Sequence, residues 1–142
     1  SLLNKKFHVT ALGSKFKAPS NKEEISIYME KKWHLLKIKR EVIEKLGFKQ
    51  QLNSQFVSDL ILEPILKIKD LRTDQRVEFM SGELPIQNLM QKVKSTPNSI
   101  GICLYPHDIE EIIKIADLSE TMPPKSTWIE PKLRSAVTIY EY

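Results

Sequence analysis

The sequence has little cysteine, little glycine and no long apolar run. Its 142 residues include one cysteine, Cys103, so a disulfide framework is excluded and the thiol is expected to be a small buried hydrophobe. The four glycines form no phosphate-cradling loop, and no serine or cysteine lies in a nucleophile-elbow motif. No apolar stretch approaches the length of a membrane span, and no signal-peptide pattern opens the chain. We therefore expect a cytoplasmic protein with no membrane partner.

The histidines give no sign of a metal site. His8, His34 and His107 fall on expected strands and at an expected helix start, without a neighbouring cysteine or carboxylate at ligand spacing. A catalytic centre, if the protein has one, is expected elsewhere in a longer chain. The sequence therefore predicts no metal, no cofactor and no catalytic residue within these 142 residues.

The bulk composition is that of an ordinary globular protein. Hydrophobic residues make up 41% of the chain and charged residues 28%. A chain of this length buries roughly 68% of its unfolded surface, so we expect a single domain over residues 1–142. A shift in net charge near residue 50 marks the one candidate boundary between two parts of this domain. The chain does not open with Met, and we expect it to be a piece of a longer protein.

The formal charge of +4 is unevenly distributed. Residues 1–50 carry twelve Lys or Arg against five acids, whereas the remainder carries ten against thirteen. A basic third of this kind is typical of proteins with an anionic partner. Its lysines are spread over strand positions and do not cluster on one helix, so nucleic-acid binding is a minority hypothesis.

Alternating apolar and polar residues predict antiparallel strands in the first third. A charged break at residues 30–32 separates two such runs and predicts a hairpin. Most of the basic residues are expected on the solvent face of these strands. The expected elements are strands over residues 7–13, 25–29 and 33–35, an exposed loop over 14–23, and a short helix over 40–46 that stops at Gly47.

The remaining two thirds alternate between helical and strand periodicity. In Ile100–Tyr105, the positions that would point to either face of a strand are apolar, which predicts a central strand covered on both faces. The pattern predicts an α+β fold, a mixed sheet with N-terminal antiparallel strands and with helices packed against a central strand. The expected elements are helices over residues 53–66, 85–94 and 107–117, and strands over 77–79, 100–105 and 136–142.

Two of these helices carry more detailed expectations. Asn53 is a favourable N-cap for the first, and Pro64 is expected to kink or shorten its last turn. The helix over 107–117 is expected to pack against the sheet through apolar residues at helical spacing. These are Ile109, Ile112, Ile113 and Ala116.

The stretch Met122–Leu133 has a composition that neither a plain helix nor a plain strand favours. It contains three of the eight prolines. The paired prolines restrict the backbone, so we expect an extended, stiff arm. Thr127 and Glu130 have the spacing of a capping box, which predicts a short helical turn from Trp128.

Two interpretations of this stretch remain open. In the first, a lysine, two hydroxyls and the free N–H groups of the turn face one way and bind an anion. In the second, the stretch is a rigid brace, with Trp128 and Leu133 filling a core. The candidate anion-binding residues are Lys125, Ser126, Thr127 and Lys132.

Two further groups of charges admit both a structural and a functional interpretation. Glu120 and Lys132 flank the proline stretch, and a mutual ion pair is the simpler interpretation. Arg72, Asp74 and Arg76 form either a charged rim of a site or a solvated turn.

Three segments resemble one bacterial protein family, called domain of unknown function 1015, in a Bacteroidetes-like version. They are residues 53–68 (NSQFVSDLILEPILKI), 70–79 (DLRTDQRVEF) and 120–134 (ETMPPKSTWIEPKLR). The likeness covers residues 52–142 well and the first fifty loosely. Ser119 and Ala136 stand where the family has glycine, which disfavours close ligand approach at those two points.

The resemblance implies that the chain is the C-terminal part of a longer protein. Full-length members carry an Asp-Gly-His-His-Arg motif in an N-terminal half that resembles ParB/sulfiredoxin-like folds, some of which are nucleotide-using serine kinases. This motif is absent here. The implied function is that of an accessory domain, with its own N-terminal half as partner and with nucleotide bound by the full-length protein. The alternatives are a scaffold or homodimerisation domain and a nucleic-acid-binding module.

Overall fold

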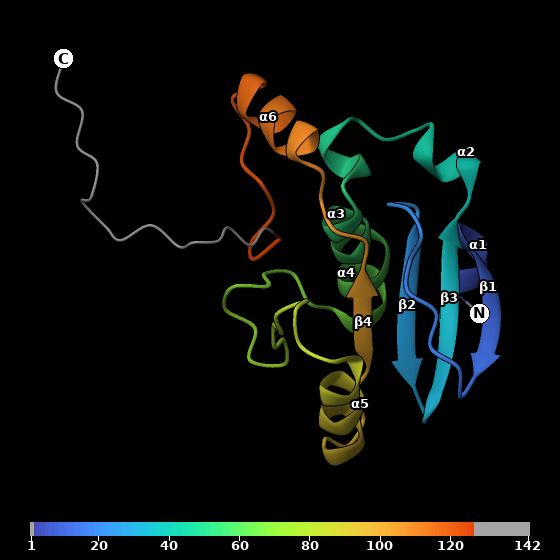
Figure 1. Ribbon diagram of the computed structural model, residues 1–142. Helices are drawn as coiled ribbons and strands as arrows, with labels where there is room; N and C mark the ends of the chain where they lie inside the picture. Colours follow the sequence, from blue (N-terminus) through green and yellow to red (C-terminus); the bar gives the residue numbers. More distant parts are fainter. Residues whose placement is uncertain (1, 127–142) are drawn as a thin grey trace, which may run out of the picture.

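A four-stranded antiparallel sheet organises the chain in the computed structural model, which describes residues 2–126 (Figure 1). Every ladder between its strands is antiparallel. Helices pack beside the sheet, and the predicted α+β class is confirmed. The strands are β1 (Phe7–Gly13), β2 (Glu24–Met29), β3 (Lys32–Ile38) and β4 (Gly101–Leu104), in the order β1-β3-β2-β4.

The predicted hairpin of β2 and β3 is confirmed. Met29 pairs with Lys32, so only two residues, Glu30 and Lys31, make the turn. Both have positive φ, 51° and 61°. Two-residue hairpins favour such turns because their twist matches that of the strands, although Asn and Gly are the usual residues there.

One long helical segment covers one face of the sheet. It comprises α3 (Asn53–Val57), a π-helical turn (Ser58–Leu62) and α4 (Glu63–Leu66). The expected irregularity near the proline therefore appears as a π turn just before it, a known way to accommodate a disturbed hydrogen-bond ladder. The core between helix and sheet contains Phe7, Ile25, Ile27, Leu36, Ile38, Phe56, Val57, Leu60, Ile61, Leu62 and Ile68.

The expected N-cap role of Asn53 is wrong. No side chain caps α3, and Leu52 occupies the N-cap position. Asn53 is buried one residue inside the helix, where its Nδ2 donates a hydrogen bond to the carbonyl of Tyr105. The amide nitrogen is thus paired with a distant segment in place of its own helix end, which sequence spacing does not reveal, while the buried Oδ1 accepts no hydrogen bond from residues 2–126.

The other face of the sheet is also covered. Trp33 and Tyr28 are fully buried there, and the Phe16 ring lies 4.6 Å from that of Trp33. The Ser26 hydroxyl donates to the Lys17 carbonyl at 2.6 Å, which holds the 14–23 loop across the strands. The loop itself is largely exposed, as predicted. The expectation of an open, solvent-facing side is wrong where the loop lies, because the loop supplies the aromatic and backbone partners of this face.

Strand β4 and its flanking segments depart from the sequence prediction. Among residues 2–126, β4 pairs only with β2, so it lies at the end of the described sheet and is half-buried. Residues 77–79 form irregular chain and no strand. The expected strand over 136–142 lies outside the described residues. Strand β4 packs closely against the Leu89 side chain at Gly101. Glycine allows this contact, because the Leu89 side chain lies 2.9 Å from where a Cβ at Gly101 would stand.

Two helices lie near opposite ends of β4, apart from each other in Figure 1. No helix within residues 2–126 is long and apolar enough to cross a membrane. Helix α5 (Ile86–Ser95) confirms the predicted amphipathic segment after Pro85. Helix α6 (Ile109–Asp117) follows β4. The remaining helical turns of residues 2–126 are short: α1 (Leu2–Lys6), α2 (Arg40–Ile43) and a 3-10 turn (Lys49–Gln51).

Helix α6 forms where expected, but its expected packing is wrong. Ile109 and Ile113 are 61% and 53% exposed, whereas Glu111 and Ile115 are buried. Glu111 is stabilised inside by hydrogen bonds from His107 and Lys22. Because polar partners hold the acidic side inward, the predicted apolar face lies outward.

Candidate anion-binding site

Two Asp-x-Arg forks build the loop of residues 70–79. Asp70 accepts hydrogen bonds from Nε and Nη2 of Arg72 at 3.1 and 3.0 Å. Asp74 and Arg76 repeat the arrangement at 2.9 and 2.6 Å. Each carboxylate also accepts the backbone N–H of its own arginine, at 2.9 and 3.0 Å. Bidentate pairs of this kind are geometrically specific, so each fork fixes a short piece of the loop.

Arg76 also ties this loop to the end of the long helix. Its Nη1 and Nη2 atoms donate to the carbonyls of Leu66 and Lys67 at 3.1 and 3.4 Å. Lys67 ends α4 in the left-handed conformation, with φ 57°. The last carbonyls of a helix have no partner within the helix, so the Arg76 guanidinium completes the helix end while it holds the loop.

The forks keep their side chains charged. Hydrogen bonds from the side chain and backbone of Arg76 lower the pKa of Asp74 to about 2. Hydrogen bonds from Arg72 likewise lower the pKa of Asp70, and the pKa of each guanidinium is raised by its own carboxylate. A general acid or base requires a pKa near the working pH. The forks therefore act as fixed charges and not as proton-transfer groups.

A tight turn presents Lys125 to solvent. Pro123 is buried and anchors the turn, while Pro124 and Lys125 are exposed. The Ser126 hydroxyl donates to the Pro123 carbonyl at 2.7 Å, which closes the turn. Lys125 has φ 55°, a conformation that non-glycine residues adopt rarely and at some energetic cost. Strained residues of this kind are concentrated at functional sites.

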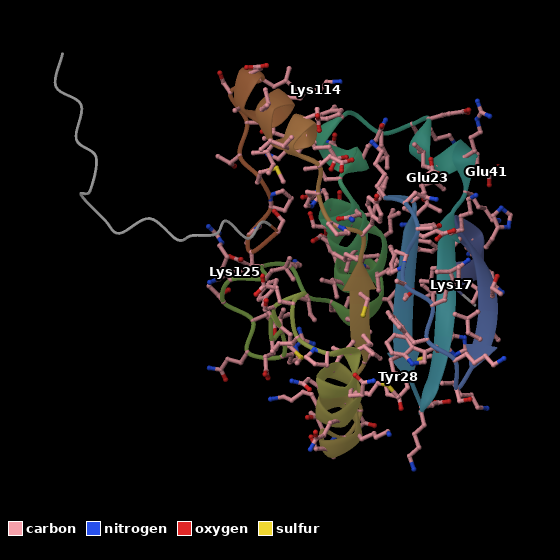
Figure 2. All side chains as sticks on the ribbon, in the orientation of Figure 1. Lys17, Glu23, Tyr28, Glu41, Lys114 and Lys125 are labelled. Atoms are coloured by element: carbon pink, nitrogen blue, oxygen red, sulfur yellow. The ribbon has the colours of Figure 1, made fainter. Side chains whose placement is uncertain are left out.

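This turn meets the forked loop across an open cavity of about 550 Å³. Figure 2 shows Lys125 beside that loop, on the side of the molecule away from β1. No sequence pattern joins the two features, which lie about fifty residues apart in the chain. The cavity is lined by Leu71, Arg72, Thr73, Asp74, Gln75, Val77, Phe79, Pro124 and Lys125.

The cavity combines positive charge with an apolar wall. Arg72 and Lys125 line the cavity as cations and Asp74 lines it as a carboxylate, so the lining carries one net positive charge. Lys125 forms no ion pair with any residue from 2 to 126. Phe79 is 45% exposed, and it forms the apolar wall together with Leu71, Val77 and Pro124. The arrangement suits a ligand with an anionic group and an apolar part.

The other predicted site residues fall differently. Ser126 uses its hydroxyl hydrogen within the turn, so its role here is to shape the position of Lys125. Thr127 and Lys132 lie outside the described residues, as does the turn expected from Trp128. Glu120 accepts a hydrogen bond from Lys49 Nζ at 2.6 Å, so it is paired with the 3-10 turn.

One group of polar residues was missed by sequence reasoning. Ser54, His107 and Glu111 are hydrogen-bonded in a chain at the start of α3 and α6. The spacing of four residues between His107 and Glu111 at a helix start was the available signal, whereas Ser54 is distant in sequence. Within residues 2–126 no group of three His, Cys, Asp or Glu is placed to hold a metal ion.

Comparison of the chain with protein-family models, with curated proteins and with solved structures finds no match.

Proposed function

We propose that this chain is an accessory domain that contributes an anion contact, made by Lys125 and Arg72, to a ligand bound together with another part of a longer protein. The observation that carries the proposal is the meeting of the Lys125 turn with the forked loop across one cavity. Lys125 supplies an ammonium group without an ion pair to residues 2–126. Arg72 supplies a guanidinium whose orientation is fixed by Asp70.

The donor geometry supports an anion as the ligand group. The Asp70 fork uses Nε and Nη2 of Arg72, which leaves Nη1 without a hydrogen bond to residues 2–126. A guanidinium held in one orientation loses less conformational entropy on binding than a free one. The turn fixes the backbone from which the Lys125 side chain extends. Phosphate is the common anion that accepts several such charged hydrogen bonds.

The resemblance to domain of unknown function 1015 supports the accessory role. Two of the three resembling segments, residues 70–79 and 120–134, include the two sides of the cavity. The resemblance places nucleotide binding and phosphotransfer in an N-terminal half whose motif this chain lacks. In this proposal, the anion contact approaches the phosphate of a ligand that the other half holds. Nucleotide hydrolysis by these 142 residues alone would contradict the accessory role.

Removing the Lys125 ammonium is expected to weaken anion binding. Lys125→Ala should raise the dissociation constant for inorganic pyrophosphate roughly tenfold, since a hydrogen bond to a charged group contributes about 1.5–3 kcal/mol. Titration calorimetry at low ionic strength measures the change. Lys94→Ala, an exposed lysine on α5, is the matched control and should bind as the wild type does. Equal weakening in both variants would indicate general charge attraction and overturn the proposal.

The outward face of α6 favours a second function, homodimerisation. Ile109 and Ile113 of α6, and Leu118 directly after it, are all more than half exposed, an unusual arrangement for isoleucine and leucine in one short segment. A second copy packed on α6 buries the exposed isoleucines of both copies against one another, so the same apolar face serves both partners, which favours a copy of this chain as the partner.

Ile113→Asp is expected to abolish such a dimer. A charge placed in an apolar helix contact loses its hydration without gaining a partner. Light scattering coupled to size exclusion should then give a dimer for the wild type and a monomer for the variant. Leu84→Asp, an exposed apolar position outside α6, should remain dimeric. A monomeric wild type at about millimolar concentration would rule out this function, since typical weak interfaces still associate there.

A further inference from the structure

The hydrogen-bonded chain of Ser54, His107 and Glu111 has the connectivity of a nucleophile, a base and an orienting acid. The Ser54 hydroxyl lies 3.0 Å from Nε2 of His107. Nδ1 of the same ring lies 2.9 Å from Oε2 of Glu111. Both distances are those of good hydrogen bonds, and the two ring nitrogens are used in the order found in serine hydrolases.

The charge of Glu111 determines which atoms carry the protons. Burial alone raises the pKa of Glu111, but hydrogen bonds from His107 and Lys22 outweigh it, so the pKa is lowered and the carboxylate is ionised at neutral pH. An ionised carboxylate only accepts hydrogen bonds, so Nδ1 of a neutral His107 must carry the ring proton. Nε2 then has a free lone pair, and the Ser54 hydroxyl donates to it.

Burial decreases from the acid and the base toward the serine. The side chains of His107 and Glu111 are 5% and 11% exposed, whereas Ser54 is only half-buried. The hydrogen bond from Asn53 to the Tyr105 carbonyl joins the two segments that carry the serine and the histidine. The base is therefore shielded and fixed in place, while the hydroxyl that it activates remains near the surface.

We infer that Ser54 is an activated nucleophile that accepts an acyl group from a carboxylic ester. Ser54 Oγ forms a bond to the ester carbonyl carbon as its proton passes to Nε2 of His107. The bond from that carbon to the alcohol oxygen breaks, and the departing oxygen takes the proton from Nε2. Water then attacks the acylated serine by the same route and releases the acid. Glu111 is a positioning residue that holds the ring tautomer.

A fluorophosphonate probe tests this inference directly. The wild-type chain should form an adduct at Ser54, located by peptide mass spectrometry, with fluoride as the leaving group. Ser54→Ala should remove this adduct. His107→Gln should slow labelling about a hundredfold or more, because positioned general bases contribute roughly 10² to 10⁴ in rate. Ser95→Ala, at an exposed hydroxyl bonded only to backbone, is the matched control and should leave labelling unchanged.

A purely structural chain of hydrogen bonds predicts a different result. His107→Gln would then lower the melting temperature, with no Ser54 adduct in the wild type. Absence of the adduct, or an adduct whose rate does not change in a folded His107→Gln protein, overturns the inference. If His107→Gln fails to fold by circular dichroism, Glu111→Gln provides the same comparison. The inference shares no residue with the Lys125 cavity, so either conclusion can fail without the other.

Discussion

Trp33→Ala is expected to lower the free energy of unfolding by about 3–5 kcal/mol, the range for large aromatic truncations in a packed core. Trp33 is fully buried, and its ring lies 4.8 Å from Tyr28 and 4.6 Å from Phe16. Removing it leaves a cavity between the sheet and the loop that covers it. Urea denaturation followed by far-ultraviolet circular dichroism measures the loss.

Phe16→Ala provides the matched comparison on the opposite side of the same contact. Phe16 is 39% exposed and belongs to the covering loop, so its removal is expected to cost about 1 kcal/mol. A Trp33→Ala protein that loses less than the Phe16→Ala protein would contradict the account. The second face of the sheet would then contribute little to stability, and the loop would be only loosely attached.

Arg76→Ala is expected to have the largest effect on the candidate site. Arg76 holds Asp74 and also caps the carbonyls of Leu66 and Lys67. Without it, the backbone amides of residues 70–79 should exchange hydrogen at least about tenfold faster. The loop can then open without breaking the hydrogen bonds of Arg76, so the free energy of local opening is lower. Pyrophosphate binding should weaken by about tenfold or more, since the forked loop no longer holds Arg72 opposite the Lys125 turn.

Arg40→Ala is the control for this prediction. Arg40 also forms a hydrogen-bonded pair with a carboxylate, that of Glu44, at 2.9 Å, but the pair lies on an exposed helical turn. Its loss should change neither exchange in residues 70–79 nor pyrophosphate binding. Unchanged exchange in the Arg76→Ala protein would show that the loop is held by other contacts.

Elements whose pattern is local were predictable from the sequence. The hairpin of β2 and β3 follows from strict alternation on both sides of a charged break, and α5 follows from one clear apolar stripe. In α5 the periodicity leaves a single choice of buried face. The hairpin instead buries both faces, with Ile25 on one and with Tyr28 and Trp33 on the other. The α+β class follows from the order of such segments.

Elements decided by distant contacts were not predictable. In α6, Ile115 belongs to a different stripe from Ile109 and Ile113, and the hydrogen bonds of Glu111 determine which stripe lies inward. The position of β4 depends on its pairing with β2, about seventy-five residues away in sequence. Likewise, the spacing near Asn53 favoured a cap, but a carbonyl beyond β4 offered the amide a better partner.

The candidate site likewise combines local features that the sequence indicates with a distant contact that it does not. The forks join residues only two apart, and the sequence indicated a charged group at Arg72, Asp74 and Arg76. It also indicated Lys125 as an anion contact. That the two lie on one cavity depends on how α6 and the following chain return past the forked loop, and no local pattern contains that information.

Amide chemical shifts during a titration with inorganic pyrophosphate locate any anion site on this chain. We expect the largest shifts in residues 71–77 and 124–126, with saturation and with affinity that falls as salt screens the charges. Shifts concentrated in the basic residues 1–50, or no saturable shift at low ionic strength, would contradict an anion site at Lys125 and Arg72.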